Sequence, residues 1–295
     1  MVRRVLSLTS GRIAVAILSV IGLLAILGPI VAPQDPDGSS PNTLAGPSAA
    51  HWLGTDYLGR DVFSRLLDGS RISVLGAVEV ALIALVVGVV PGILSVYLGR
   101  VFEWTALRLV DTLIALPFLL FAVAVVALLG NGISQAMIVV GVLVAPLYFR
   151  VSRAATLQVA RSQYVEAAII SGSSLPAIVR RHVWVKVLPP IAVALAQTIG
   201  TGFIIVSSLT FLGIGVSPPA PTWGGLLASD LGYLTYQWYA PIAPAVLVMA
   251  TVWASNLLAD AIRDVSGEAG RALLNRRKAN GHRLEQTVLA KGVTR

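Results

Sequence analysis

The sequence predicts an all-α, polytopic membrane protein with six transmembrane helices, and three observations carry this prediction. Of the 295 residues, 56% are hydrophobic and only 12% are charged, whereas a soluble domain carries roughly 25% charged residues. The chain contains six apolar runs close to the ~20 residues that a membrane-spanning helix needs. Its Lys and Arg residues gather on alternate connecting segments, as they do in proteins that cross a membrane repeatedly.

The six expected spans follow one another along most of the chain. Gly and Pro occur inside them, which a membrane bundle tolerates because neighbouring helices satisfy the freed backbone groups. Arg3 and Arg4 precede the first run, as in a signal peptide, but its apolar core exceeds the usual ~15 residues and no clean Ala-x-Ala site follows, so a retained anchor is favoured. The predicted spans are 13–32, 72–98, 112–129, 133–149, 187–212 and 241–259.

The distribution of Lys and Arg sets the expected orientation. With the amino terminus in the cytoplasm, 19 of the 22 Lys and Arg residues fall in cytoplasmic segments, and only Arg60, Arg65 and Arg71 fall outside, in agreement with the positive-inside rule. Both termini are therefore expected in the cytoplasm, and the net charge of +8 fits anionic lipid rather than nucleic acid. The expected organisation is a cytoplasmic amino-terminal segment (1–12), a six-span domain (13–265) with outer loops at 33–71 and 213–240 and an inner segment at 150–186, and a cytoplasmic tail (266–295).

Sequence motifs for catalysis and for metal binding are missing. A phosphate-binding P-loop needs Gly-Lys followed by Ser or Thr, and none of the three lysines follows a glycine. The chain has no Cys, and its three histidines, His51, His182 and His282, show no His-Glu-x-x-His pattern. The sequence therefore predicts no enzyme activity, no metal site and no cofactor bound by this chain, and a membrane enzyme is the least favoured class.

One carboxylate, Glu79, lies inside an expected span, about two turns below its outer end. An ionisable residue within a membrane span is by default a functional hypothesis, so Glu79 is a candidate for a translocation pathway. The alternative is a packing residue that pairs with an arginine near the outer surface. An ion-coupled secondary transporter usually needs more such groups, so their scarcity indicates that energy is supplied from outside the chain.

The inner segment 150–186 predicts two helices joined at a glycine. The first helix is expected over 153–170 and to end near Gly172, because glycine is favoured after a helix C-terminus. The second helix is expected to begin at Ser-Ser-Leu-Pro, where Ser173 or Ser174 can cap it and Pro176 suits its first turn. Two helices that meet in this way form an elbow that projects from the membrane.

Glu166, Ala167 and Ala168 lie on the first arm of this elbow. Small residues let another protein approach closely, and a carboxylate can anchor Arg or Ser of that protein. The alternative is a surface helix whose Glu166 pairs with Arg161 or Arg180. The residues alone leave the two interpretations open.

Five segments together resemble one known family. Glu-Ala-Ala, three residues and Gly, at 166–172, resembles the cytoplasmic signature of permease subunits of ABC importers. The other segments resemble, in the right order, the dipeptide/oligopeptide/nickel permease group, and the short first outer loop is similar to the second of that group's two paired permeases. These segments are HWLGTDYLGRDVFSRLLDGSRIS (51–73), YLGRVFEWTALRLVDTLIALP (97–117), SSLTFLGIGVSPPAPTWGGLL (207–227) and NLLADAIRD (256–264).

The resemblance implies the ABC importer permease fold in the bacterial plasma (inner) membrane. It implies a heterodimer with a homologous permease, two ABC ATPase subunits that use ATP and Mg, and an extracytoplasmic substrate-binding protein. The elbow would dock into a cleft on the ATPase, with Glu166, Ala167, Ala168 and Gly172 as the coupling residues. Di- or oligopeptides are the expected cargo; nickel or another small solute, and, in a different class, an ion-coupled secondary transporter, are the alternatives.

One part of the elbow departs from the family pattern. The family's loop commonly ends in Leu-Pro, whereas this chain has Trp184-Val185 at that position. The second helix is therefore expected to continue to about Leu188, before Pro189 and Pro190 break it.

Gly88 and Gly92 of the second expected span form a Gly-x-x-x-Gly pair that predicts close helix packing.

Polar residues of the fifth span and charged residues of the first outer loop complete the candidates for functional residues. Asp61 and Arg65 are four residues apart and can pair on a helix, so the charged outer segment is either a self-satisfied loop or a docking surface for the binding protein. The pathway candidates besides Glu79 are Gln197, Thr198, Thr201, Ser207 and Ser208, and the outer docking candidates are Asp56, Arg60, Asp61 and Arg65.

Overall fold

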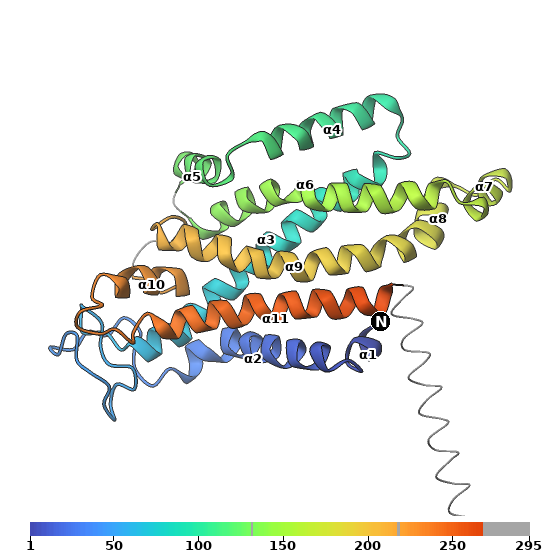
Figure 1. Cartoon of the computed structure of the whole chain (residues 1–295). Helices are drawn as coiled ribbons and strands as arrows, with labels where there is room; N and C mark the ends of the chain where they lie inside the picture. Colours follow the sequence, from blue (N-terminus) through green and yellow to red (C-terminus); the bar gives the residue numbers. More distant parts are fainter. Residues whose placement is uncertain (131, 217–218, 268–295) are drawn as a thin grey trace, which may run out of the picture.

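The computed structural model describes residues 1–130, 132–216 and 219–267, and Figure 1 shows them as a long helical bundle. No strand occurs among the described residues; only two isolated bridges tie the first loop. The helices are α1 (Val2–Val5), α2 (Thr9–Val31), α3 (Val62–Leu94), α4 (Arg100–Ala115), α5 (Phe118–Leu129), α6 (Ile133–Ala160), α7 (Gln163–Ile170), α8 (Leu175–Ile178), a π-helical turn η1 (Val179–Val183), α9 (Trp184–Phe211), α10 (Trp223–Leu231) and α11 (Ile242–Ser266).

The predicted membrane class is confirmed. Among the described residues, five helical stretches are long and apolar enough to cross a membrane: α2, α3, α6, α11 and the continuous stretch Pro176–Phe211. A sixth span exists if the bent pair α4 and α5 is one crossing. The short α1 and α10, and the elbow helices α7 and α8, do not reach spanning length by themselves.

The third predicted span, 112–129, was wrong as a single helix. The chain bends by 97° between α4 and α5. Leu116 is extended, with φ −74° and ψ 137°, because the residue before a proline is driven away from the helical region. Pro117 therefore ends α4, and the apolar run continues in another direction as α5.

Other boundaries also differ from the prediction. α3 begins at Val62 rather than at 72, because Asp61 caps it by accepting a hydrogen bond from the Ser64 backbone N–H at 2.8 Å. The first loop therefore ends ten residues before the predicted 71. The fourth span does not stop at 149, since α6 continues to Ala160.

The prolines of the fifth span do not break it, contrary to the prediction. Pro189 and Pro190 lie inside α9, which is continuous to Phe211. Each proline leaves the carbonyl four residues earlier without its helical donor, at Val185 and Lys186. Both of these residues are exposed, so water can satisfy the freed carbonyls and the helix is maintained.

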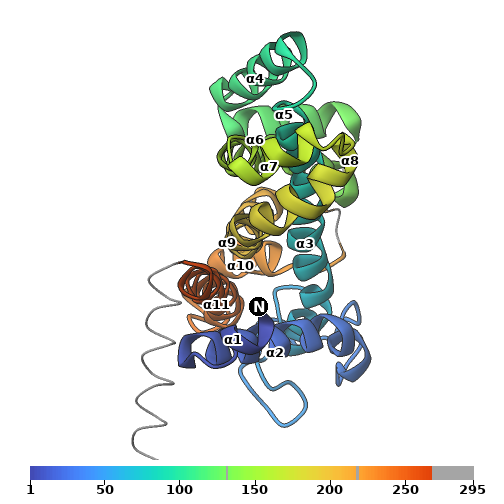
Figure 2. The same ribbon diagram turned by 90° about the vertical axis from the view of Figure 1, so that its right-hand side faces the viewer.

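The centre of the bundle is formed by α3, α6 and α9, and α2 and α11 pack along one side of it. Figure 2 shows α9 between α6 and α11, with α3 beside it. Gly88 and Gly92 lie where α3 crosses α6, and a Cβ on Gly88 would be only 2.3 Å from the Ala145 carbonyl oxygen. The predicted close packing at this glycine pair is confirmed.

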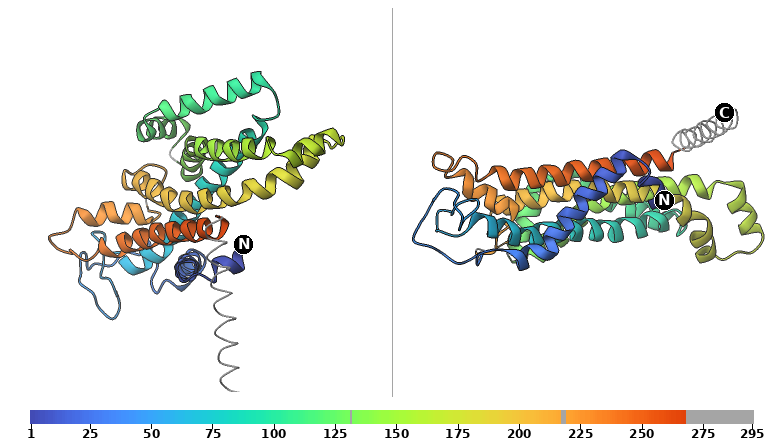
Figure 3. Two further views of the ribbon diagram at one scale, coloured as in Figure 1. Left: turned by 45° about the vertical axis from the view of Figure 1, so that its right-hand side comes forward. Right: turned by 90° about the horizontal axis from the view of Figure 1, so that it is seen from below.

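The two ends of the bundle differ. At one end, α7 and α8 project beyond the other helices; we call this the elbow end (Figure 3). At the opposite end, the loop end, segments 32–61 and 212–241 pack on each other. Gln237, which is 3% exposed, joins them by donating hydrogen bonds to the carbonyls of Ala45 and Thr55 at 2.8 and 3.0 Å.

Candidate functional site

The first arm of the elbow is the short helix α7. The predicted helix over 153–170 is interrupted at Arg161 and Ser162, and α7 starts anew because the Val165 and Glu166 N–H groups donate to the Ser162 carbonyl. α7 ends at Ile170, Gly172 just beyond it has a φ of +75°, and the Ser173 N–H donates back to the Ala168 carbonyl at 3.0 Å. This hydrogen bond and the left-handed glycine are typical of a Schellman C-cap, so the predicted role of Gly172 in ending the helix is confirmed.

One side of α7 is buried and the other is open. Val165 is completely buried, and Ala168 packs against the same core. Glu166 and Ala167 are exposed, and Ile170 is 87% exposed. Within the described residues Glu166 has no ion pair, so the alternative in which it pairs with Arg161 or Arg180 is not formed.

The second arm of the elbow is continuous with a membrane helix. α8 passes into the π-helical turn η1, and η1 passes into α9 with helical dihedral angles at Ile178, Val183 and Trp184. π-helical turns are rare and occur frequently at functional sites. The second arm of the elbow and α9 therefore form one unbroken helical path into the bundle.

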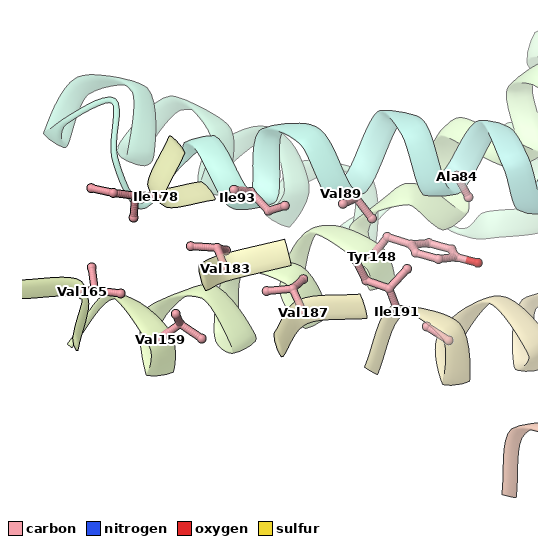
Figure 4. Close-up of a cluster of buried hydrophobic side chains, with 11 residues drawn as sticks. Ala84, Val89, Ile93, Tyr148, Val159, Val165, Ile178, Val183, Val187 and Ile191 are labelled. Carbon is pink, nitrogen blue, oxygen red and sulfur yellow. The ribbon is translucent and has the colours of Figure 1, made fainter. Parts of the chain in front are cut away.

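A single cluster of buried side chains also joins the elbow to the bundle (Figure 4). Val165 of α7 and Ile178 of α8 form its elbow end, and Val183 and Val187 continue it along η1 and α9. It reaches Tyr148 of α6 deep between the helices. The cluster therefore packs the elbow against α3, α6 and α9 in one close-packed interior.

The open face of α9 carries part of the predicted polar set. Thr201 and Ile204 are exposed, and Gln197 and Ser208 are half-buried. Spacings of four, three and four residues place these side chains on one face of a helix. The hydroxyls of Thr201 and Ser208 donate to carbonyls of their own helix, at 3.2 Å to Gln197 and 2.7 Å to Ile204.

Two other pathway candidates are turned into the subunit. Thr198 is 1% exposed and the Ser207 hydroxyl oxygen is buried. The structure therefore separates Gln197, Thr201 and Ser208, which share an open face, from Thr198 and Ser207, which face the packed interior. Polarity alone did not distinguish these two groups.

Glu79 is not brought to the open face of α9. α3 contacts α9 through Ala77, whose carbonyl lies 3.3 Å from a Cβ built on Gly202. Glu79 lies on the other side of α3, between Leu75 and Leu82, which are 54% and 52% exposed. No described residue forms an ion pair with Glu79, so the alternative in which it pairs with an outer arginine is not formed.

The four charged candidates of the first outer segment are buried at the loop end. Arg60 donates from Nε to Asp56 at 2.8 Å, and Asp56 lies 3.7 Å from Nε of Arg65. The predicted pair of Asp61 with Arg65 was wrong, because the Asp61 carboxylate caps α3 and contacts His51 Nδ1 at 2.9 Å. All four are at most 8% exposed, so most of their contacts are with one another and with neighbouring segments of the loop end.

A fifth charged residue at the loop end, Asp230 of α10, was not singled out from the sequence. It is 6% exposed, and burial, followed by the nearby charge of Asp56, raises the pKa of Asp230 to about 6. An acid whose pKa rises on folding favours the folded state below its usual pKa and loses that contribution as pH rises through the folded value. Asp230 therefore favours the folded loop end in acid and disfavours it above about pH 6.

The structure adds residues that the sequence did not indicate. Val165 and Ile170 of α7 point to opposite sides, one into the core and one outward. Their spacing is a weak signal because the arm has only eight residues. Over residues 1–130, 132–216 and 219–267, no group of three His, Cys, Asp or Glu side chains is arranged to hold a metal ion.

A bundle of five or six membrane-length helices among the described residues, with a projecting elbow, defines a polytopic membrane domain. The chain belongs to the family described as the binding-protein-dependent transport system inner membrane component, whose pattern matches residues 84–268. It is accordingly an ABC transport permease and a multi-pass protein of the bacterial inner membrane.

Three relatives show the same similarity over most of their length. A probable D,D-dipeptide transport system permease of Escherichia coli is 34% identical and covers 88% of this chain and 86% of its own. A glutathione transport system permease of Pectobacterium atrosepticum is 36% identical, with coverages of 74% and 73%. A di/tripeptide transport system permease of Pseudomonas aeruginosa is 36% identical, with coverages of 81% and 82%.

Proposed function

We propose that this chain is one of two paired permeases of an ABC importer that carries di- or oligopeptides into the cell. A homologous permease completes the pathway, two ATPase subunits bind ATP and Mg, and an extracytoplasmic binding protein delivers the peptide. The relatives named for dipeptide, glutathione and di/tripeptide transport support the peptide class. Both termini and the elbow end face the cytoplasm, which is supported by the distribution of Lys and Arg.

The observation that carries this proposal is the elbow. Glu166 and Ala167 lie exposed on a short helix whose other side is fixed in the core by Val165. The small alanine leaves room for a partner, and the carboxylate, which has no ion pair among the described residues, provides a charged anchor. When the ATPase subunits close, the elbow moves with them, and α8, η1 and α9 carry the displacement into the bundle.

The pathway in this proposal follows the open face of α9. Gln197, Thr201 and Ser208 would contact the passing peptide, and Thr198 and Ser207 would hold the bundle together. Polar side chains that face lipid cost free energy, so this face of α9 is expected to line a water-filled pathway or to contact a second subunit. The matching face of the partner permease would form the other wall.

The function is tested by reconstituting this chain with its partner permease and ATPase subunits in lipid vesicles. ATP-dependent uptake of a labelled dipeptide, stimulated by a loaded binding protein, is the expected result. Uptake of nickel but not of peptide would contradict the peptide substrate class, while the assignment as an importer permease would still hold. ATP hydrolysis by the purified chain alone would contradict the division of labour between the subunits.

The pathway is tested by adding bulk to the open face of α9. Thr201→Phe is expected to lower peptide uptake at least tenfold, because the ring would project into the pathway. Val246→Phe is the matched control: Val246 is 48% exposed on α11, among apolar neighbours that suit lipid. Initial uptake rates in the reconstituted vesicles measure both. Equal rates for the two variants would place the pathway elsewhere.

The orientation is tested with single cysteines, since the chain has none of its own. Ala49→Cys and Thr235→Cys lie at exposed positions of the loop end, and Ser173→Cys lies at an exposed position of the elbow. An impermeant maleimide added outside spheroplasts is expected to label the first two and to label the third only after lysis. Labelling of Ser173→Cys in intact spheroplasts would reverse the proposed topology.

A further inference from the structure

A hollow of about 810 Å³ lies at the loop end, between the first outer segment and the segment that leads into α10. Tyr57, Leu58 and Arg60 line one side of it, and Phe211 and Ser229 line the other. Phe211 is the last residue of α9 and is 40% exposed. The hollow therefore lies directly beyond the end of α9, at the opposite end of the molecule from the elbow.

Arg60 is held rigidly at the wall of this hollow. Its Nε donates to Asp56 at 2.8 Å, and its guanidinium carbon lies 5.8 Å from the centre of the Tyr57 ring. Tyr57 is itself stacked on Tyr233, with ring centres 5.2 Å apart and planes 11° apart. Among the described residues, only Nε of the three Arg60 guanidinium nitrogens has a hydrogen-bond acceptor.

Arg60 and Arg65, the two outer arginines that line the hollow, differ in what they bind. The terminal nitrogens of Arg65 donate to the carbonyls of Pro36 at 2.9 Å and Pro219 at 3.1 Å. The terminal nitrogens of Arg60 have no hydrogen-bond acceptor in the part of the chain that the structure describes. Arg65 therefore binds the loops together, whereas Arg60 presents unused donors at the wall of the hollow.

We propose that the hollow receives a loop of the extracytoplasmic binding protein, and that Arg60 binds a carboxylate of that loop. A guanidinium with two free nitrogens matches a carboxylate in geometry and charge. The exposed rim residues Tyr57 and Leu58 supply apolar area around this charge, and Tyr and Arg are enriched at the energetic centres of protein interfaces. The family to which the chain belongs transports in dependence on a binding protein, and the inference rests on the proposed function.

The test uses the reconstituted complex in nanodiscs and the purified, peptide-loaded binding protein of the same transport system. That protein is chosen beforehand as the one that stimulates the ATPase activity of the wild-type complex. Arg60→Ala is expected to weaken its affinity about tenfold and Arg60→Glu about a hundredfold, and the concentration for half-maximal stimulation should rise by the same factors. The difference between wild type and Arg60→Ala should shrink in high salt, because the contact is ionic.

Two further variants separate docking from folding and from general charge. Leu58→Glu adds a negative charge at the 46% exposed rim, leaves the Asp56 to Arg60 hydrogen bond in place, and is expected to weaken binding about tenfold. Arg71→Ala removes an exposed outer arginine that does not line the hollow, and is expected to stay within twofold of wild type.

Wild-type affinity for the binding protein in both Arg60→Glu and Leu58→Glu would overturn the proposal. If the Arg60 variants do not accumulate in the membrane, wild-type affinity in Leu58→Glu by itself would overturn it. Unchanged affinity with lost peptide uptake would also overturn it, because Arg60 would then act on the substrate. A wild-type complex that transports peptide without being stimulated by any binding protein of its transport system would refute the docking site alone. A wild-type complex without any peptide transport would refute the proposed function.

Discussion

Glu166→Lys is expected to abolish peptide uptake while the chain still enters the membrane in normal amounts. Glu166 is exposed on α7 and has no ion pair within the described residues, so the variant breaks no contact inside the subunit. A charge-assisted contact with the ATPase is worth roughly 1.5–3 kcal/mol, and lysine replaces it by repulsion between like charges. Glu166→Ala should be milder, because it removes the contact without adding repulsion and keeps the helix.

The measurement is peptide uptake in reconstituted vesicles together with co-purification of the ATPase subunits. Gln163→Lys is the matched control, since Gln163 is exposed on the same helix and gains the same charge. We expect the control to assemble and transport at close to the wild-type rate. Wild-type assembly and uptake by Glu166→Lys would show that Glu166 does not anchor the elbow.

The elbow shows which local features a sequence reveals. Gly172 was recognisable because glycine adopts the left-handed conformation without strain, and its φ of +75° agrees. The interruption at Arg161 and Ser162 carries no such mark, because neither residue breaks a helix by its own chemistry. The continuation of α9 past Pro189 and Pro190 was also hidden, because prolines favour a helix end and the sequence does not show that the residues with the freed carbonyls are exposed.

At the candidate site, the contacts that a side chain makes depend on residues far away in the sequence. Asp56 with Arg60 and Asp61 with Arg65 have the same spacing, yet only the first pair forms. Asp61 caps α3 instead, and Arg65 binds segments that lie far away in the chain. The polar residues of α9 were likewise identifiable by type, but their division into an open and a buried face depends on which helices cover α9. A sequence lacks that information until the bundle is known.

The apolar runs predicted the bundle well because burial in lipid imposes length and composition on every span. Their ends were less predictable, since a cap such as Asp61 or a bend at Pro117 acts locally. The Gly88–Gly92 spacing predicted a specific contact between two helices, because two helices can approach closely only where no side chain lies between them. The consequence of that exclusion for stability can be measured directly.

Gly88→Ala is expected to be among the most destabilising single-methyl changes in the chain. A Cβ at Gly88 would lie 2.3 Å from the Ala145 carbonyl oxygen and 2.6 Å from the Tyr148 Cβ, so α3 and α6 must separate to admit it. Overpacking of this kind typically costs 1–3 kcal/mol. It would also disturb the buried cluster around Tyr148 that reaches the elbow, so uptake should fall together with stability.

Gly22→Ala in α2 is the matched control, because a Cβ built there has no described atom within 4 Å apart from its chain neighbours and the nearby backbone of its own helix. Alanine is a better helix former than glycine by roughly 1 kcal/mol, so this variant should be neutral or slightly stabilising. Thermal unfolding of the purified chains in the same detergent measures both: the midpoint for Gly88→Ala should fall by several degrees, and that for Gly22→Ala should hold or rise. A Gly88→Ala protein that unfolds at the same temperature as the Gly22→Ala protein, or at a higher one, would contradict the close contact of α3 with α6 at this glycine. It would also contradict the packing around Tyr148 that links the elbow to the bundle.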